Sequence, residues 1–147
     1  MSVQQEIEEF ALQSFAVLQS DYNFRPPRVR RESWITWIDF FKANIAVEVE
    51  IDWREFGIDL FLVRLEAGRL PKGLYRSGGK KCRVHLLTLI REKQWSVDQT
   101  IVSQIRFGPA DPRVREVGHL KVQLGNYRKL LLSCMSQILA EGENLFE

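Results

Sequence analysis

Apolar side chains near the start of the chain recur at the three- and four-residue steps of an α-helix. The positions that follow this spacing are Ile7, Phe10, Ala11, Phe15 and Leu18. Acidic residues occupy the early turns, where carboxylates favour the positive end of the helix dipole. The pattern predicts an amphipathic N-terminal helix over residues 3–20, with Ser2 in position to cap it.

Three runs between residues 33 and 65 have the composition and alternation of β-strands. They are SWITWIDFF (33–41), NIAVEVEID (44–52) and GIDLFLVRL (57–65). Only a few residues connect these runs, and strands joined by such short links must pair antiparallel, because a parallel pair needs a long crossover. We therefore expect an antiparallel sheet of three or four strands, reached from the first helix through the extended connector RPPRVRRES.

The stretch after the predicted sheet is rich in glycine and proline. Residues 66–84 are typical of a loop, and HLLTLIREKQ (85–94) fits either a helix or a strand, of which the helix is favoured. Ser96 and Gln99 have the spacing of a capping box. A further short helix is therefore expected to begin at Ser96.

A long apolar stripe runs through the last third of the chain. Asp111 followed by Pro112 is typical of an N-cap and the first residue of a helix, and Gly142 is a natural end. The stripe consists of Val114, Val117, Leu120, Leu124, Tyr127, Leu131, Cys134 and Ile138. It predicts a long C-terminal helix over residues 112–141 that packs on the sheet, and the same stripe could also form the seam of a homo-oligomer.

Length and composition place these elements in one folded domain. The 147 residues are 45% hydrophobic and 27% charged, which suffices for a sizeable core. We expect a single α+β domain over residues 1–147, with an antiparallel sheet centred on residues 33–65 and covered by the N-terminal and C-terminal helices.

Basic residues gather in two segments, although the formal net charge is only +2. The first contains Arg28, Arg30 and Arg31; the second contains Lys72, Arg76, Lys80, Lys81 and Arg83. Within the second, GLYRSGGKKC spaces Gly73 and Gly78 as in a Walker A loop, but Gly79 stands where that motif requires lysine. The segments are either a solvated, mobile loop and a charged connector or, if they meet in space, one surface for nucleic acid or another anion.

Acidic residues gather on the second predicted strand. Glu48, Glu50 and Asp52 alternate with apolar residues, and Trp53 and Phe56 follow at the predicted hairpin turn. Such a row can be the solvated side of a sheet, paired with lysine or arginine on a neighbouring strand. It can also bind a protein partner, with the turn aromatics as anchors.

Residues with nucleophilic or metal-binding chemistry form no recognisable motif. The chain contains two cysteines without CxxC spacing and two histidines, and it lacks GxSxG, HExxH and GxGxxG. We therefore expect a non-enzymatic protein without cofactor or metal. The acidic start and the lack of a long apolar run indicate a cytoplasmic protein with no membrane segment.

The order of several segments resembles small bacterial α+β proteins of the immunity-protein type, found among toxin-neutralising genes. The segments are LQSDYNF, WITWI, NIAVEVEIDWREFGIDLFLVRL and HLKVQLGNYRKLLL. The resemblance implies a protein that acts by binding a protein partner rather than by catalysis. The hypothesis is thus a small intracellular protein-binding module, with nucleic-acid or anion binding through residues 25–31 and 69–83 as the alternative.

Overall fold

A five-stranded antiparallel sheet forms the centre of the computed structural model, which describes residues 1–108 and 117–147. Its strand order is β1-β2-β3-β4-β7. The strands are β1 (Arg28–Arg31), β2 (Ile35–Lys42), β3 (Ile45–Asp52), β4 (Gly57–Arg64) and β7 (Arg83–His85). The predicted antiparallel sheet is confirmed, but it gains two edge strands.

The two additional strands correct the sequence interpretation at both edges of the sheet. Part of the predicted connector pairs with β2, with Arg30 opposite Trp37. Part of the predicted loop pairs with β4, with Arg83 opposite Val63. Neither segment alternates apolar and polar residues over enough positions to be recognised as a strand, because β1 has only four residues and β7 only three.

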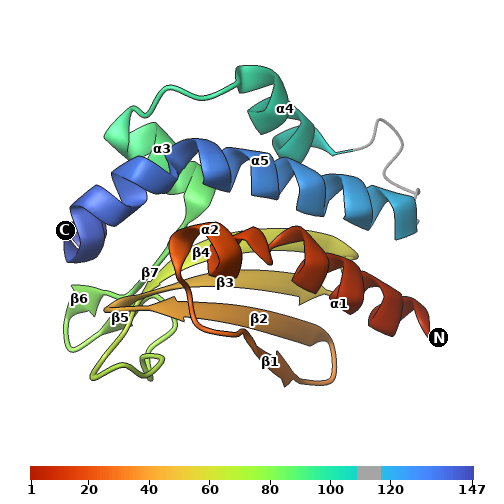
Figure 1. The fold of residues 1–147 in the computed structure, drawn as a ribbon, viewed down its shortest axis with the longest axis horizontal. Coiled ribbons are helices and arrows are strands. Elements are labelled where there is room, and N and C mark those ends of the chain that lie inside the picture. Colours follow the sequence, from red (N-terminus) through yellow and green to blue (C-terminus); the bar gives the residue numbers. More distant parts are fainter. Residues whose placement is uncertain (109–116) are drawn as a thin grey trace.

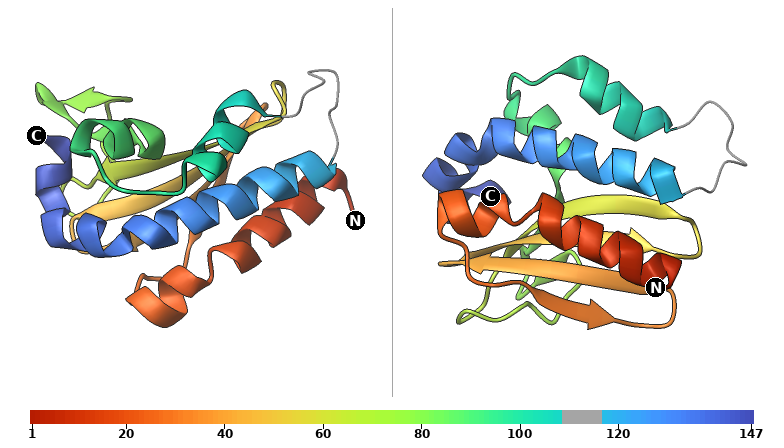
Figure 2. Two further views of the ribbon diagram at one scale, coloured as in Figure 1. Left: turned by 90° about the horizontal axis from the view of Figure 1, so that it is seen from above. Right: turned by 45° about the vertical axis from the view of Figure 1, so that its right-hand side comes forward.

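All helices of the described chain lie on one side of this sheet (Figures 1 and 2). They are α1 (Val3–Ser14), α2 (Val17–Tyr22), α3 (Leu86–Lys93), α4 (Gln99–Phe107), α5 (Val117–Glu141) and the 3-10 helix η1 (Gly142–Phe146). Helices α1 and α5 run side by side over the sheet, and α4 lies on α5 (Figure 2). None of the helices described carries an apolar stretch long enough to cross a membrane.

The helix ends follow the sequence in most cases. Ser2 caps α1 in a capping box with Gln5, as expected for the first residue before the helix. The predicted helix 3–20 is two helices, because the chain turns at Phe15 so that both Phe15 and Leu18 reach the core. Helix α3 confirms the favoured interpretation of residues 85–94, and α5 ends at Gly142, which adopts a φ of +52°.

The expected start of the second short helix is wrong. Asp98, rather than Ser96, caps α4, since its carboxylate accepts the N–H of Thr100 at 2.9 Å. The predicted cap of the long helix at Asp111 and Pro112 lies outside the described residues.

The side of the sheet that faces the helices carries the main core. Strand β3 contributes Ile45, Val47, Val49 and Ile51, and α5 contributes its stripe from Leu120 to Ile138. The alternation of β3 predicted this side correctly. The opposite side, which we call the outer face, carries a second and smaller core of Ala46, Phe61, Val63 and Leu65 with Phe41 and Leu70 beside it.

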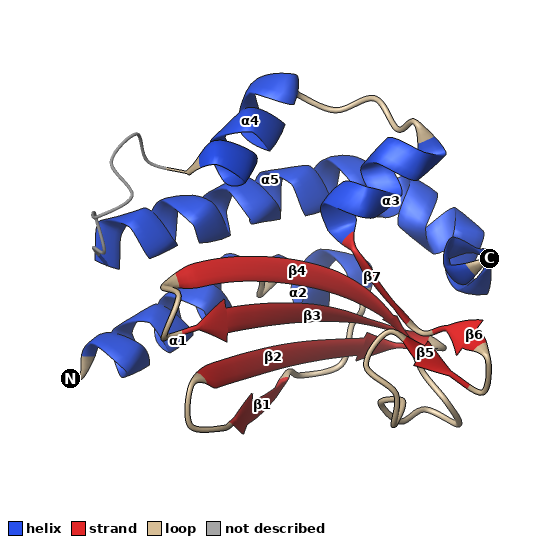
Figure 3. Cartoon of the chain, turned by 180° about the vertical axis from the view of Figure 1, so that it is seen from behind, coloured by secondary structure: helices blue, strands red, loops and turns tan. Residues whose placement is uncertain are grey.

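The loop between β4 and β7 covers part of the outer face. It contains a small hairpin of β5 (Arg76–Ser77) and β6 (Lys80–Lys81), visible beside the sheet in Figure 3. The segment predicted as a plain loop therefore has regular structure. Its cover gives the outer face an interior of its own.

Leu131 and Leu139 on α5 provide a test of how the long helix packs. Leu131 is fully buried, whereas Leu139 is 36% exposed. Leu131→Ala should lower the free energy of unfolding by about 2–5 kcal/mol, because it leaves a cavity in the main core. Leu139→Ala, the same change on the same helix, should cost less than half as much in urea denaturation. Equal costs would contradict this packing.

Candidate functional site on the outer face of the sheet

The outer face gathers most of the polar side chains that are set into the sheet. Cross-strand pairing brings together Trp37 opposite Arg30, Asp39 opposite Glu48, and Phe61 opposite His85. No described helix lies on this side (Figure 3). The polar groups here must therefore be satisfied by one another, by the loop above them or by a partner.

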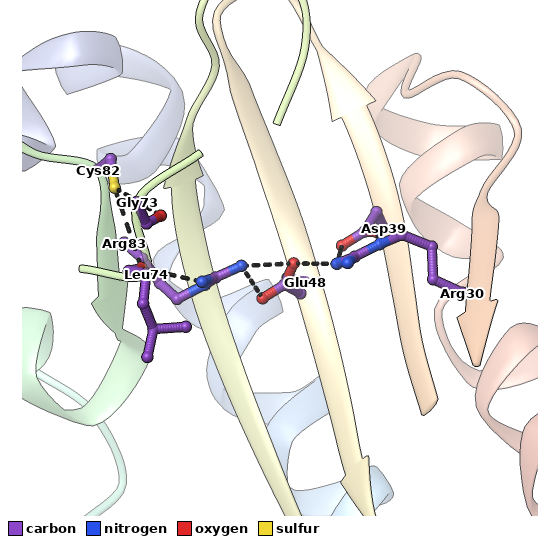
Figure 4. Close-up of polar contacts among 7 residues, drawn as sticks. All are labelled: Arg30, Asp39, Glu48, Gly73, Leu74, Cys82 and Arg83. Atoms are coloured by element: carbon purple, nitrogen blue, oxygen red, sulfur yellow. Dashed lines mark hydrogen bonds and ion pairs between the residues drawn. The ribbon is translucent and has the colours of Figure 1, made fainter. Parts of the chain in front are cut away.

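Four side chains form an ion cluster across the full width of the sheet. The arginine–carboxylate cluster consists of Arg30, Asp39, Glu48 and Arg83, shown in Figure 4. Arg30 donates from Nε to Asp39 Oδ2 at 2.8 Å and from Nη2 to Glu48 Oε2 at 2.9 Å. From the other side, Arg83 Nη2 lies 2.7 Å from Glu48 Oε1 and 3.0 Å from Oε2.

Burial distinguishes this cluster from an ordinary surface ion pair. The side chains of Asp39 and Glu48 are 0% and 1% exposed. Burial, followed by the neighbouring Asp39 carboxylate, raises the pKa of Glu48 to about 8, against the lowering effect of Arg83. Glu48 consequently gains or loses a proton near neutral pH, while both arginines donate hydrogen bonds to its carboxyl group.

Arg83 also holds the loop to the sheet. Its Nη1 donates to the carbonyl of Leu74 at 2.9 Å, while its Nη2 contacts Glu48 (Figure 4). Cys82 adds a second attachment, since its N–H donates to Tyr75 O at 2.8 Å and its thiol contacts Gly73 O at 3.5 Å. A side chain at Gly73 would collide with the carbonyl of Arg76, so the close approach requires glycine there.

The hairpin in GLYRSGGKKC is anchored rather than free. Gly78 and Gly79 adopt φ angles of +59° and +77°, which are the left-handed values of a two-residue hairpin turn. Arg64 on β4 donates from Nε to Lys81 O at 3.1 Å and from Nη2 to Ser77 O at 3.4 Å. These hydrogen bonds attach both strands of the hairpin to β4.

A groove runs between the loop and the outer face. Its first part, of about 280 Å³, is lined by Arg30, Trp37, Glu50 and Lys72 and by the residues of the attached loop. A second part, of about 520 Å³, shares Phe61, Tyr75 and Arg83 with the first and extends to His85 and Glu92. Leu74 and Tyr75 form the lip of this groove and are 64% and 56% exposed.

His85 lies in the second part of the groove, and both of its ring nitrogens are engaged. Nδ1 accepts the N–H of Leu87 at 3.1 Å, so the proton of the neutral ring is on Nε2. Nε2 lies 3.0 Å from Asp59 Oδ1 and 3.2 Å from the Tyr127 hydroxyl. Burial raises the pKa of Tyr127 and of the Cys82 thiol, which keeps both groups protonated. The His85 contacts tie β4, β7 and α5 together.

The prediction that the acidic residues of β3 form an exposed surface is wrong. Glu48 is fully buried, and Glu50 is half-buried in the groove. Asp52 turns into the β3–β4 connection, where its carboxylate accepts the N–H groups of Arg54 and Glu55 at 2.9 Å. Glu48 does pair with basic residues, as the open alternative allowed, but Arg30 and Arg83 come from the edge strands β1 and β7 rather than from the strands next to β3.

The predicted aromatic anchors of the β3–β4 turn are only partly available. Trp53 and Phe56 are both half-buried against the main core. The indole N–H of Trp53 donates to the hydroxyl of Thr36 at 3.0 Å. Their packing stabilises the turn, and the exposed apolar residues of the outer face are instead Leu74 and Tyr75.

The two basic segments meet at one point. Arg30 from the first and Arg83 from the second both contact Glu48, so both guanidinium groups are already engaged where they come together. Arg31 instead pairs with Glu8 of α1 at 2.9 Å, and Arg28 is exposed at the sheet edge. The remaining basic residues of the second segment, Lys72, Arg76, Lys80 and Lys81, lie around the loop and hairpin.

No protein-family model, curated protein or solved structure matches the chain. Among the described residues, no group of three or more histidine, cysteine, aspartate or glutamate side chains is placed to hold a metal ion. The function must therefore be argued from the geometry of the outer face.

Removing the central carboxylate should destabilise the protein strongly. Glu48→Leu leaves Arg83, whose side chain is 10% exposed, without its carboxylate partner, and breaking a buried pair in this way costs about 3–5 kcal/mol. Glu48→Gln keeps an acceptor oxygen and should cost much less at pH 7. Denaturant unfolding of both variants checks this expectation. Equal stability of the two would show that the cluster contributes little.

The raised pKa of Glu48 predicts how stability depends on pH. The folded protein retains a proton that the unfolded chain has released, from the ordinary value of 4.5 up to about 8. The contribution of Glu48 to stability should therefore fall as pH rises through this window, by at most about 1.4 kcal/mol per pH unit. Glu48→Gln removes the titrating group, so the free energy of unfolding of this variant should rise steadily relative to that of the wild type from pH 5 to pH 8. A difference that is constant with pH would contradict the shift.

Proposed function

We propose that this chain is a non-enzymatic protein-binding module that docks its partner in the groove on the outer face. The observation that carries the proposal is the lip, where Leu74 and Tyr75 stand more than half exposed beside a groove lined by both acidic and basic residues. Large apolar side chains surrounded by charged ones are typical of protein interfaces, where aromatic residues act as anchors.

The charges of the groove favour a polypeptide over a nucleic acid. Arg30 and Arg83 are already engaged by Asp39 and Glu48. Lys72 and Glu50 line the same part of the groove, and the second part has both Asp59 and Glu92 and the basic residues Arg76 and Lys81 in its lining. Carboxylates would repel a phosphate backbone, whereas a peptide offers partners for both signs.

The lip is held in place before any partner arrives. Arg83 and Cys82 fix the backbone of residues 73–75 to the sheet, and the ring of Tyr75 lies 6.5 Å from that of Phe61. A surface that is ordered in advance loses less conformational entropy on binding. This supports a module that acts through a stable complex, as the resemblance to immunity proteins implies.

The chemistry around the groove supports binding rather than catalysis. His85 uses one ring nitrogen to cap α3 and the other to bind Asp59 and Tyr127. The thiol of Cys82 is buried and contacts backbone carbonyls. Neither group is in the state that nucleophilic or general-base catalysis needs.

Truncating the lip should abolish partner capture without unfolding the protein. Leu74→Ala with Tyr75→Ala removes two exposed side chains but keeps the carbonyls that Arg83 and Cys82 use. Loss of two interface anchors should weaken binding by about 30-fold or more. Proteins cross-linked to the wild type in extracts of the producing cells are identified by mass spectrometry, purified, and titrated against both forms by calorimetry.

Phe107→Ala provides the matched control, because Phe107 is 79% exposed on α4 and lies outside the groove. It should capture the same proteins as the wild type with unchanged affinity. If the lip variant bound every captured protein as tightly as the Phe107 variant, the groove would not be the docking surface.

A further inference from the structure

The small hairpin carries basic residues that the arginine–carboxylate cluster does not neutralise. Lys80 and Lys81 have no ion pair with any described carboxylate, and Arg76 donates only to the carbonyl of Gly79, at 3.3 Å. Both lysines lie on β6, directly after the Gly78–Gly79 turn. Three positive charges are thus placed on a hairpin of two short strands.

These charges meet in a cavity between the hairpin and the C-terminal segment. The cavity measures about 480 Å³, which is within the range of small-ligand sites. Its charged lining consists of Arg64, Arg76, Lys80 and Lys81, opposite Glu143 and Glu147. The C-terminal segment lies beside the hairpin in Figures 1 and 3. One wall of the cavity therefore comes from β4 and the hairpin, and the other comes from the residues that follow α5.

Hydrogen bonds and an ion pair hold the backbone on both sides of this cavity. Arg64 fixes both strands of the hairpin through the carbonyls of Ser77 and Lys81. On the opposite wall, Lys93 donates to Asn144 O at 3.4 Å and pairs with Glu141 at 3.1 Å, which holds the end of α5 and η1. The basic groups are therefore presented by a fixed backbone on each side.

We infer that this cavity binds a phosphate-bearing ligand. Four basic side chains face one small space against two carboxylates, and a compact dianion or trianion would satisfy the excess positive charge. Glu143 and Glu147 would compete with the ligand for the ammonium groups of Lys80 and Lys81. Arg76 and Lys81 line both this cavity and the second part of the groove, whereas Lys80 and the two glutamates line the cavity and not the groove.

The same arrangement favours a compact anion over an extended nucleic-acid track. Arg30 and Arg83, the residues that would continue a track across the sheet, are already paired with Glu48. The excess of positive charge is confined to the hairpin and its neighbour Arg64. A single phosphate group, free or at the end of a larger ligand, is the chemistry that this confinement fits.

Calorimetric titration with inorganic pyrophosphate, at low and at physiological salt, tests the inference. Lys80→Gln with Lys81→Gln should weaken binding at least roughly tenfold, because each hydrogen bond from a charged donor contributes more than a factor of ten. Glu143→Gln with Glu147→Gln should strengthen it, because two competing carboxylates are removed. Circular dichroism and thermal unfolding confirm that each variant is folded.

Arg106→Gln with Lys129→Gln is the matched control, since it removes the same charge from two exposed basic residues outside both the cavity and the groove. It should leave pyrophosphate affinity within roughly twofold of the wild type. Equal losses in this control and in the Lys80 and Lys81 variant, or no binding at low salt, would overturn the inference. A single-stranded oligonucleotide with a 5′-phosphate and the same oligonucleotide without it separate the phosphate sources. Displacement of pyrophosphate by the phosphorylated form alone supports a site for the terminal phosphate of a larger ligand, and displacement by neither supports a site for a small free phosphate compound. Equal displacement by both shows diffuse attraction to the phosphate backbone and would overturn the inference.

Discussion

Glu48 lies on the central strand of the sheet, and the two arginines that contact it come from the two edge strands. Arg30 reaches it from β1 across β2, and Arg83 reaches it from β7 across β4. The edge strands are only four and three residues long, so their ladders alone give them little stability. A shared buried carboxylate therefore ties both edges to the centre, and Arg83 extends the tie to the loop through Leu74.

The properties of the outer face follow from this cluster. Because Arg30 and Arg83 are held by Asp39 and Glu48 on the floor of the groove, the apolar residues Leu74 and Tyr75 lie above guanidinium groups that already have partners. The charges left over are those of the hairpin, which points away from the cluster and is held by Arg64. One side of the loop thus offers an apolar lip and mixed charge, and the other offers positive charge, so the two sides suit different classes of ligand.

Local patterns in the sequence predicted the parts of the fold that rest on local physics. The alternation of β3, the capping of α1 by Ser2 and the apolar stripe of α5 each depend on residues close together in the chain. The arginine–carboxylate cluster depends on register instead. A hairpin centred between Ala43 and Asn44 places Asp39 opposite Glu48, so this pair could be predicted from the position of the turn in the sequence. The contribution of Arg30 and Arg83 was not, because it required knowing that β1 and β7 are strands.

Alternation identifies the side of a sheet to which a residue points, but it does not reveal what covers that side. Glu48 and Glu50 point to the same face, yet only Glu48 is fully buried, because the loop attached through Arg83 and Cys82 lies over it. The attachment depends on single features with no periodic signature, such as a glycine at position 73 that admits the carbonyl of Arg76. Whether a row of carboxylates on a strand is exposed or buried therefore depends on the loop that covers it. The position of that loop must be known before such a row can be interpreted from the sequence.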